Sequence, residues 1–432
     1  MSKTQRALAI ISIGFIALVW ISLALPAEEV KGETLLIKGG TVQTITRGVI
    51  SDGQVLIKNG KIEKIGKNLP LPAGAAVIEA KDGWIMPGFV VAHTYPLAMH
   101  SLIRDDNNPK IFNYLDPFSM ELRLCLAAGI TTFSPNFGTS LFGGADPRRK
   151  NYSFYNAVLK SHYGSLRDMF VKEPVYLYIN ITALRPSEKD ELRGFFQKSR
   201  EYLTRELEYE KKKGEKDAKP PVLAPDIKNY VAVLKRELFV RFYADLKKDI
   251  LKVLAFVDEF GFQAQILGAA EGWLLAEEIG RRNISTIIQP AVYQKGDPYA
   301  RPEGGSNIRN SVLQREKGIE FALLCTSPSI FLGGTIGDDL LTFPLAGAFA
   351  VRGGLSEKDT LEALTIKPAK LLGIADRIGS LEEGKDADII ILDGNPLDYR
   401  TYVDYTIVNG RVLYDKSQSN LFKKIPKPKR MF

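Results

Sequence analysis

Histidine is scarce in this chain, since its 432 residues include only His93, His100 and His162. Catalytic zinc is commonly held by three protein ligands, of which histidine is the usual one. His100 and His162 are lone histidines, for which a surface or hydrogen-bonded imidazole is the favoured interpretation. The count therefore argues against a zinc site built from histidines.

Cysteine is rarer still. Cys125 and Cys325 lie 200 positions apart, and neither has a CxxC neighbour. This spacing gives no sign of a cysteine metal site or a redox pair. Two buried thiols are favoured, with a disulfide as the weaker alternative.

Neither sign of charge dominates, since 58 basic residues face 50 acidic ones and the net charge is +8. The 45% hydrophobic and 25% charged fractions are ordinary for a globular protein. Part of the basic excess lies in residues 417–432. A basic tail can contact anionic lipid or nucleic acid, but a solvated chain end is favoured, and no nucleic-acid partner is predicted.

The first residues indicate export. Lys3 and Arg6 precede an uncharged apolar run from Ala7 to Leu25, which is the pattern of an export sequence. Ser22-Leu23-Ala24 fits a cleavage site, but the run is nearly long enough to span a bilayer. We predict that residues 1–27 are a signal peptide or an N-terminal membrane anchor. The rest of the chain would then lie outside the cytoplasm, in the periplasm or another extracytoplasmic space.

Short β-strand patterns occupy both ends of the remaining chain, at 33–88 and 375–416. Each end contains an Asn-Gly pair between apolar segments, at Asn59-Gly60 and Asn409-Gly410. Asn-Gly is the strongest short hairpin signal, because both residues tolerate a positive φ. Neither set of strands can close a core alone, so we predict one small β-sandwich made from both ends of the chain.

Between them, residues 89–374 alternate apolar strand patterns with helical segments, which predicts βα units and a parallel sheet of α/β class. Residues 188–219 form a charged insertion with apolar positions at helical spacing, so a helix packed by one face is expected. A partner-binding arm is the less favoured interpretation of that insertion. The candidate strands are 89–92, 131–134, 175–179, 239–243, 263–267, 285–288 and 321–324.

Two sequence stretches resemble the amidohydrolase superfamily, close to its imidazolonepropionase-like members. One is GWIMPGFVVAHTYPLAMH at 83–100, and the other is LSEKDTLEALTIKPAKLLG at 355–373, followed by RIGSLEEGKDAD at 377–388. With the terminal β patterns, the resemblance spans nearly all of residues 33–415. It implies a TIM-like (β/α)8 barrel joined to the β-sandwich, with one or two divalent metals, usually zinc, at the C-terminal ends of the strands.

The positions at which the family carries metal ligands hold other residues here. The first His-x-His pair corresponds to His93 and Tyr95, and the acidic position before it is Val91. Asn180 is the weakest match, to a carboxylate midway along the barrel. The family's two later histidine positions correspond to Tyr243 and Gly268, and its final aspartate position corresponds to Thr326. These are remnant positions, which keep their place in the family pattern but not the metal ligand. No metal or other cofactor is predicted from this set.

Two functions follow from the resemblance. The first is an exported amidohydrolase-like protein that has lost metal-dependent hydrolysis and acts by binding, as a homodimer or as the partner of an active relative. A membrane contact through an uncleaved N-terminus would fit that role. The alternative is an amidohydrolase that acts on C–N bonds of non-peptide or cyclic amides. Its rearranged site would use His93, Asp105 or Asp106, and Cys325.

Overall fold

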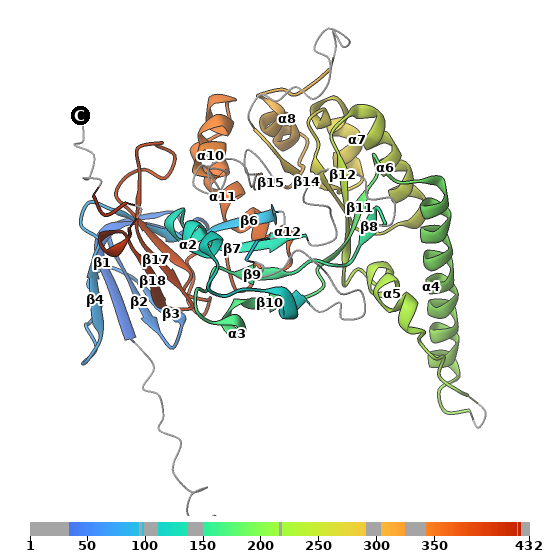
Figure 1. Cartoon of the computed structure of the whole chain (residues 1–432), viewed down its shortest axis with the longest axis horizontal. Coiled ribbons are helices and arrows are strands. Elements are labelled where there is room, and N and C mark those ends of the chain that lie inside the picture. The colour runs from blue at the N-terminus through green and yellow to red at the C-terminus, as the bar shows by residue number, and fades with distance from the viewer. Residues whose placement is uncertain are drawn as a thin grey trace, which may run out of the picture.

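The computed structural model describes residues 34–94, 97–98, 111–136, 150–215, 218–290, 304–324, 343–420 and 422–424. It is an α/β protein in which a sheet at one end adjoins parallel strands and their covering helices (Figure 1). Within these ranges, no helix is long and apolar enough to cross a membrane. The predicted export segment and most of the basic tail lie outside the described residues.

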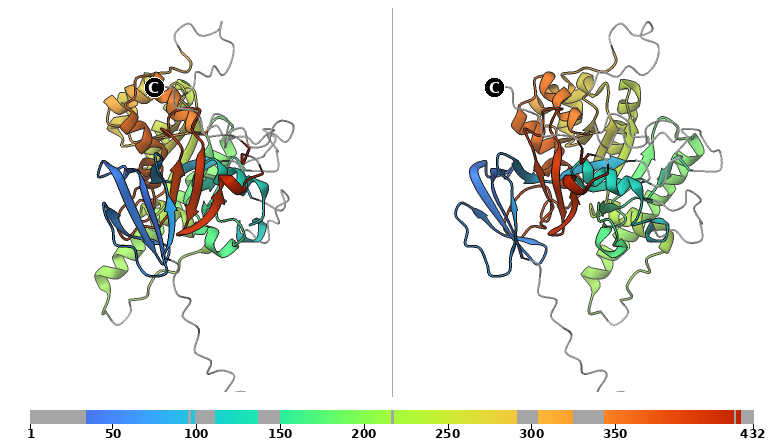
Figure 2. Two further views of the ribbon diagram at one scale, coloured as in Figure 1. Left: turned by 90° about the vertical axis from the view of Figure 1, so that its left-hand side faces the viewer. Right: turned by 60° about the vertical axis from the view of Figure 1, so that its left-hand side comes forward.

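The two ends of the chain form one eight-stranded sheet, and Figure 2 shows the early and late strands side by side. Its order is β18-β17-β16-β5-β1-β2-β3, with β4 paired to β1. The buried core of this sheet includes Ile37, Ile57, Ile389 and Ile407, which come from both ends. Its strands are β1 (Thr34–Gln43), β2 (Val49–Lys58), β3 (Lys61–Gly66), β4 (Ala76–Glu79), β5 (Trp84–Pro87), β16 (Ile389–Leu392), β17 (Val403–Val408) and β18 (Arg411–Asp415).

The two Asn-Gly turns meet each other in this sheet. Asn59, Gly60, Asn409 and Gly410 all have positive φ, as the hairpin signal predicts. The backbone N–H of Ala387 donates to Gly60 O at 2.9 Å, and Gly410 N–H donates to Ala387 O at 3.0 Å. One residue between the turns therefore joins the N-terminal and C-terminal strands.

Within the described residues, seven parallel strands lie at the centre of the molecule, and all seven overlap the predicted ones. β6 pairs with β7 in one sheet, whereas β11 to β15 pair in sequence order in another. Three short strands line the edges of these sheets: β8 (Tyr152–Ser153), β9 (Val158–Lys160) and β10 (Phe170–Lys172). The seven are β6 (Phe89–Thr94), β7 (Ile130–Pro135), β11 (Tyr176–Asn180), β12 (Phe239–Ala244), β13 (Ala264–Gly268), β14 (Ser285–Ile288) and β15 (Phe321–Leu323).

An asparagine side chain links the two central sheets between β7 and β11. Asn156 forms an isolated bridge with Asn136, just after β7. Its Oδ1 accepts hydrogen bonds from the backbone of Val175 and Tyr176 at 3.0 Å each, and its Nδ2 donates to Tyr176 O at 2.7 Å. This amide satisfies backbone groups at the start of β11.

The central strands are buried on both faces, as their largely apolar sequences predict, although polar residues such as Arg241 and Gln265 are buried among them. Along β6, Phe89 and Val91 pack in the larger core that includes the helices, whereas Val90 and Ala92 pack in a second core among the strands. The covering helices are α2 (Met120–Ala127), α3 (Leu166–Met169), α5 (Lys228–Leu234), α6 (Lys247–Phe260), α7 (Ala276–Arg281), α8 (Asn310–Glu316), α10 (Phe343–Arg352), α11 (Glu357–Leu364) and α12 (Ile366–Leu371). Single 3-10 turns occur at Ile111–Tyr114, Pro225–Ile227, Gly272–Leu275 and Lys416–Gln418.

The predicted charged helix corresponds to α4 (Pro186–Lys212), which runs along one edge of the molecule (Figure 1). It begins with proline in its first turn and a capping box completed by Glu188. Leu192, Phe196 and Tyr202 are buried on one face, and Phe196 packs on the ring of Phe260. The other face is charged and exposed, as expected for an amphipathic helix on a core.

Candidate functional site

The described remnant positions lie together at the C-terminal ends of the central strands. His93 lies near the end of β6, and Asn180 is the last residue of β11, in register with Tyr243 of β12. Gly268 ends β13 beside Ala244. The other residues named from the sequence lie outside the described residues: Tyr95, His100, Asp105, Asp106, Cys325 and Thr326. Cys125 is a buried free thiol.

His93 is buried, with 4% of its surface exposed, and its ring stacks on Tyr178 of β11 with centroids 6.2 Å apart. Burial, assisted by the positive charge of Arg241, lowers the pKa of His93 well below its ordinary value. The imidazole is therefore neutral near pH 7. A neutral imidazole can accept a proton in catalysis.

This lowered pKa makes folding sensitive to acid. Unfolded His93 takes up a proton near pH 6.5, whereas folded His93 does so only at lower pH. Stability is therefore unaffected above about pH 6.5 and falls below it, by up to about 1.4 kcal/mol per pH unit for one such group. We expect His93→Gln to reduce the pH dependence of urea unfolding between pH 7.5 and 5. An unchanged pH dependence in that variant would contradict the assignment.

Asp245 occupies the space beside Gly268. The Tyr243 hydroxyl donates a hydrogen bond to Asp245 Oδ2 at 2.8 Å. Gly268 has φ +98°, and a Cβ added there would overlap Oδ1 of the same carboxylate. The position that the family resemblance assigns to a histidine therefore has neither the backbone conformation nor the room for a side chain.

A buried arginine lies one layer below these residues. Arg241 has no exposed surface, and its Nη1 donates to the carbonyl oxygen of Ala92 at 2.7 Å. Its Nε and Nη2 both donate to Oε1 of Gln265, at 3.1 and 2.8 Å. The guanidinium also stacks on the ring of Tyr176, with its carbon 3.9 Å from the centroid. Within the described ranges, no carboxylate lies within ion-pair distance of it.

Glu271, after β13, organises the loops at the same end of the strands. Its carboxylate accepts hydrogen bonds from the backbone of Lys247 at 2.6 Å and of Gly305 at 2.8 Å. Lys247 is the first residue of α6, a helix that has no side-chain cap of its own. Glu271 therefore supplies this cap from another element and is committed to structure.

The described residues do not fit the zinc site that the family resemblance implies. A catalytic zinc needs about three nitrogen, oxygen or sulfur ligands from the protein. In the part of the chain that the structure describes, no three His, Cys, Asp or Glu side chains are grouped to hold a metal ion. Gly268 offers no ligand atom, and the charge of Arg241 opposes a second cation nearby.

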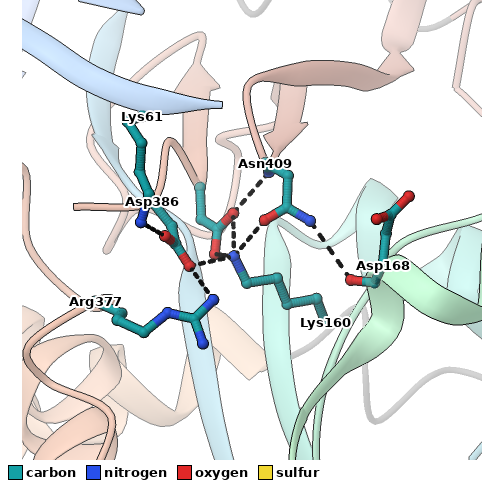
Figure 3. A network of polar contacts seen from close by, with 7 residues as sticks. Lys61, Lys160, Asp168, Arg377, Asp386 and Asn409 are labelled. Carbon is teal, nitrogen blue, oxygen red and sulfur yellow. Dashed lines mark hydrogen bonds and ion pairs between the residues drawn. The ribbon is translucent and has the colours of Figure 1, made fainter. Parts of the chain in front are cut away.

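A second polar cluster lies at the opposite end of β6, between the central strands and the terminal sheet (Figure 3). Lys160 of β9 is 1% exposed, and its Nζ lies 2.7 Å from Asp386 and 2.9 Å from Asp388. Lys160 also donates to Asn409 Oδ1 at 2.5 Å, and Arg377 lies 2.8 Å from Asp386. Burial would raise the pKa of Asp386, but these cations lower it to about 2. Because Asp388 O accepts from the N–H of Gly88, the cluster fixes how the chain begins β6.

Sequence reasoning missed the residues that shape the site, namely Arg241, Asp245 and Gln265. One signal was available, because Arg241 is a charged residue inside the apolar strand pattern Phe239–Ala244. A charge within a buried strand is rare unless it has a specific partner. Nothing in the sequence indicated that Asp245 would contact the next strand, because this contact depends on the pairing of β12 with β13.

Known proteins resemble the chain both in part and over most of its length. Residues 318–413 match the Amidohydrolase family. The imidazolonepropionase of Thermoplasma acidophilum is 33% identical over 93 residues, which are 20% of this chain and 22% of that protein. The 5'-deoxyadenosine deaminase of Methanobrevibacter smithii is 23% identical over 420 residues, 90% of each chain. The chain thus spans about a fifth or less of the length of the curated relatives that it matches locally.

The fold is also similar to that of a solved amidohydrolase structure. The crystal structure of an amidohydrolase from Thermotoga maritima superposes with a TM-score of 0.70 and 25% identity, covering 88% of this chain and 100% of that one. The match at residues 318–413 and the fold therefore both support the amidohydrolase superfamily for this chain.

Proposed function

We propose that this chain hydrolyses C–N bonds of non-peptide or cyclic amides, at a rearranged site on the C-terminal ends of the central strands. The observation that carries the proposal is a neutral, buried His93 at the strand end where the superfamily begins its site. Relatives along the chain support the reaction class, since they are an imidazolonepropionase, dihydroorotases and a 5'-deoxyadenosine deaminase.

The proposed chemistry uses side chains of this chain. His93, whose imidazole is neutral at the working pH, accepts a proton from the water as the water oxygen bonds to the amide carbon. It returns that proton to the departing nitrogen as the C–N bond breaks. Asp245, oriented by the hydroxyl of Tyr243, is a hydrogen-bond acceptor at the same end of the strands. No step is assigned to a metal, since the described residues do not fit one.

We further propose that the two central sheets are parts of one (β/α)8 barrel and that the curled terminal sheet is the small β-sandwich. Contacts between β15 and β6 support closure on one side, and Asn156 bridges β7 to β11 on the other. In the terminal sheet, Ile62 N–H donates to Lys385 O at 2.9 Å, which returns the edge strand β3 to the segment before β16. One continuous barrel would bring His93 and Tyr243 to one rim.

The test is turnover of a panel of amides, cyclic amides and purine nucleosides by the purified chain, with its metal content measured in parallel. We expect hydrolysis of at least one compound, at a rate that treatment of the protein with a chelator does not change. His93→Ala is expected to lower kcat by about 10²–10⁴-fold, the usual contribution of a general base. His162→Ala is the matched control, because His162 is also 4% exposed but lies beside Asp168, away from this rim.

A second candidate function is binding without catalysis, which Gly268 favours because its position has no room for a ligand side chain. In that case the chain would act alone as a homodimer or with an active relative as its partner. Absence of turnover across the panel would favour this candidate. Turnover with about one tightly held zinc per chain would contradict both candidates as stated.

A further inference from the structure

We propose that the interior of the central strands contains an anion site, formed by Arg241, Tyr176 and Ser134, which takes the carboxylate of a small molecule. The site lies directly below the rim described above. Arg241 and Tyr243 are two residues apart on β12, so their side chains face the same way. Arg241 also donates to the carbonyl of Ala92, the residue before His93.

The first observation is a buried charge that the described residues leave uncompensated. The guanidinium has no exposed surface, and every hydrogen bond that it donates to a described residue goes to a neutral oxygen, of Ala92 or Gln265. A charge away from water is unfavourable unless it is paired. Arginine in such a position therefore indicates an anion nearby, and its planar fork matches a carboxylate.

The second observation concerns two hydroxyl groups. Tyr176 Oη and Ser134 Oγ are buried and have no hydrogen-bond partner among the described residues. The guanidinium carbon of Arg241 lies 3.9 Å from the centre of the Tyr176 ring. Ser134 is near enough to lower the pKa of the Tyr176 phenol, so the three groups converge. Buried hydroxyl groups are nearly always satisfied, and orphans indicate an unseen water or ligand.

The donors left over match one carboxylate group. A guanidinium has five N–H donors, and three hydrogen bonds are made by Arg241, which leaves two N–H groups. Each hydroxyl adds one more donor. The acceptor capacity of a carboxylate, about four lone-pair sites, is the same size. A bound molecule would direct its remaining atoms toward His93.

Binding needs no turnover, so this proposal is tested separately from the C–N bond hydrolysis proposed above. The full chain is titrated with acetate and glutarate at constant ionic strength, and binding is followed by thermal unfolding and calorimetry. Acetamide and glutaramide serve as neutral analogues of the same shape, and chloride as an inorganic anion. We expect a saturable rise in Tm with a carboxylate and no rise with the amides.

Three variants locate the site. Tyr176→Phe should weaken carboxylate binding by about 5–10-fold, the equivalent of one hydrogen bond. Arg241→Met should remove the response, whereas Arg205→Met, which removes the same charge from the exposed side of α4, should not change it. Equal responses to amides, a response to chloride alone, or an unchanged response in Arg241→Met would overturn the proposal. A wild-type protein whose Tm does not rise with any carboxylate would also overturn the proposal. In that case a carboxylate of the chain itself would neutralise Arg241.

Discussion

Replacing Lys160 with methionine should lower the free energy of unfolding by about 3–5 kcal/mol at pH 7, the usual result of breaking a buried ion pair from one side. Lys160 Nζ lies 2.7 and 2.9 Å from two aspartates that are themselves 4% and 2% exposed. Methionine fills a similar volume but leaves both carboxylates with less compensation. Urea unfolding of the purified protein measures the loss.

Lys61→Met is the matched control for this prediction. Lys61 contacts the same Asp386, but its side chain is 49% exposed, and Asp386 keeps Lys160 and Arg377. A half-exposed ion pair contributes about 0–1 kcal/mol. Equal losses in the two variants would show that burial at Lys160 is not the cause.

The same cluster predicts how acid affects folding. Despite its burial, Asp386 has its pKa lowered to about 2, chiefly by Lys160, whereas an unfolded aspartate titrates near 4. The stabilisation is thus complete above about pH 4 and is lost as the pH falls from there toward 2. In Lys160→Met the pKa of Asp386 should rise, so the variant should lose less of its remaining stability over that interval.

Gly268→Ala should be the second strongly destabilising change, and Gly268→His should be at least as severe without creating a metal site. A non-glycine residue at a left-handed φ costs about 1–2 kcal/mol. Overlap of the new Cβ with Asp245 should add about 1–3 kcal/mol, the usual cost of overpacking. Urea unfolding measures the sum, and metal analysis of the histidine variant checks for retained zinc.

Gly305→Ala separates the two causes. Gly305 has φ +101°, close to the +98° of Gly268, but no atom of a described residue lies within 4 Å of its added Cβ. Gly305→Ala should therefore lose only the stability that a left-handed φ costs, about 1–2 kcal/mol. The double variant Asp245→Ala with Gly268→Ala should recover part of the stability that Gly268→Ala loses beyond this amount. If Gly305→Ala and Gly268→Ala lose the same stability, the contact with Asp245 is not the cause.

The strands and the superfamily could be predicted from the sequence because both depend on local patterns. The seven central strands are short, largely apolar runs bounded by turns, and the matched stretch at 318–413 contains the ending recognised at 355–388. The amidohydrolase resemblance is confirmed by the comparisons. Export of the chain and loss of catalysis stay predictions.

The sequence predicted which residues occupy the candidate site, but not the contacts that surround them. His93, Tyr243 and Gly268 were placed by analogy with a family pattern, and the structure brings them to one end of the strands. Their surroundings could not be read in the same way. Asp245 acts on Gly268 across a strand pair, and Arg241 meets Ala92, which lies 149 positions away.

The sequence by itself determined the order of strands and helices, the two Asn-Gly turns and the scarcity of histidine and cysteine, because each depends on neighbouring residues or on composition. The tertiary structure decided which charges are buried together. Lys160 and Asp386 are separated by 226 positions, and their pairing exists only because the terminal sheet closes against β9. Burial strengthens the ion pair between Lys160 and Asp386, because charges removed from water interact far more strongly than exposed ones.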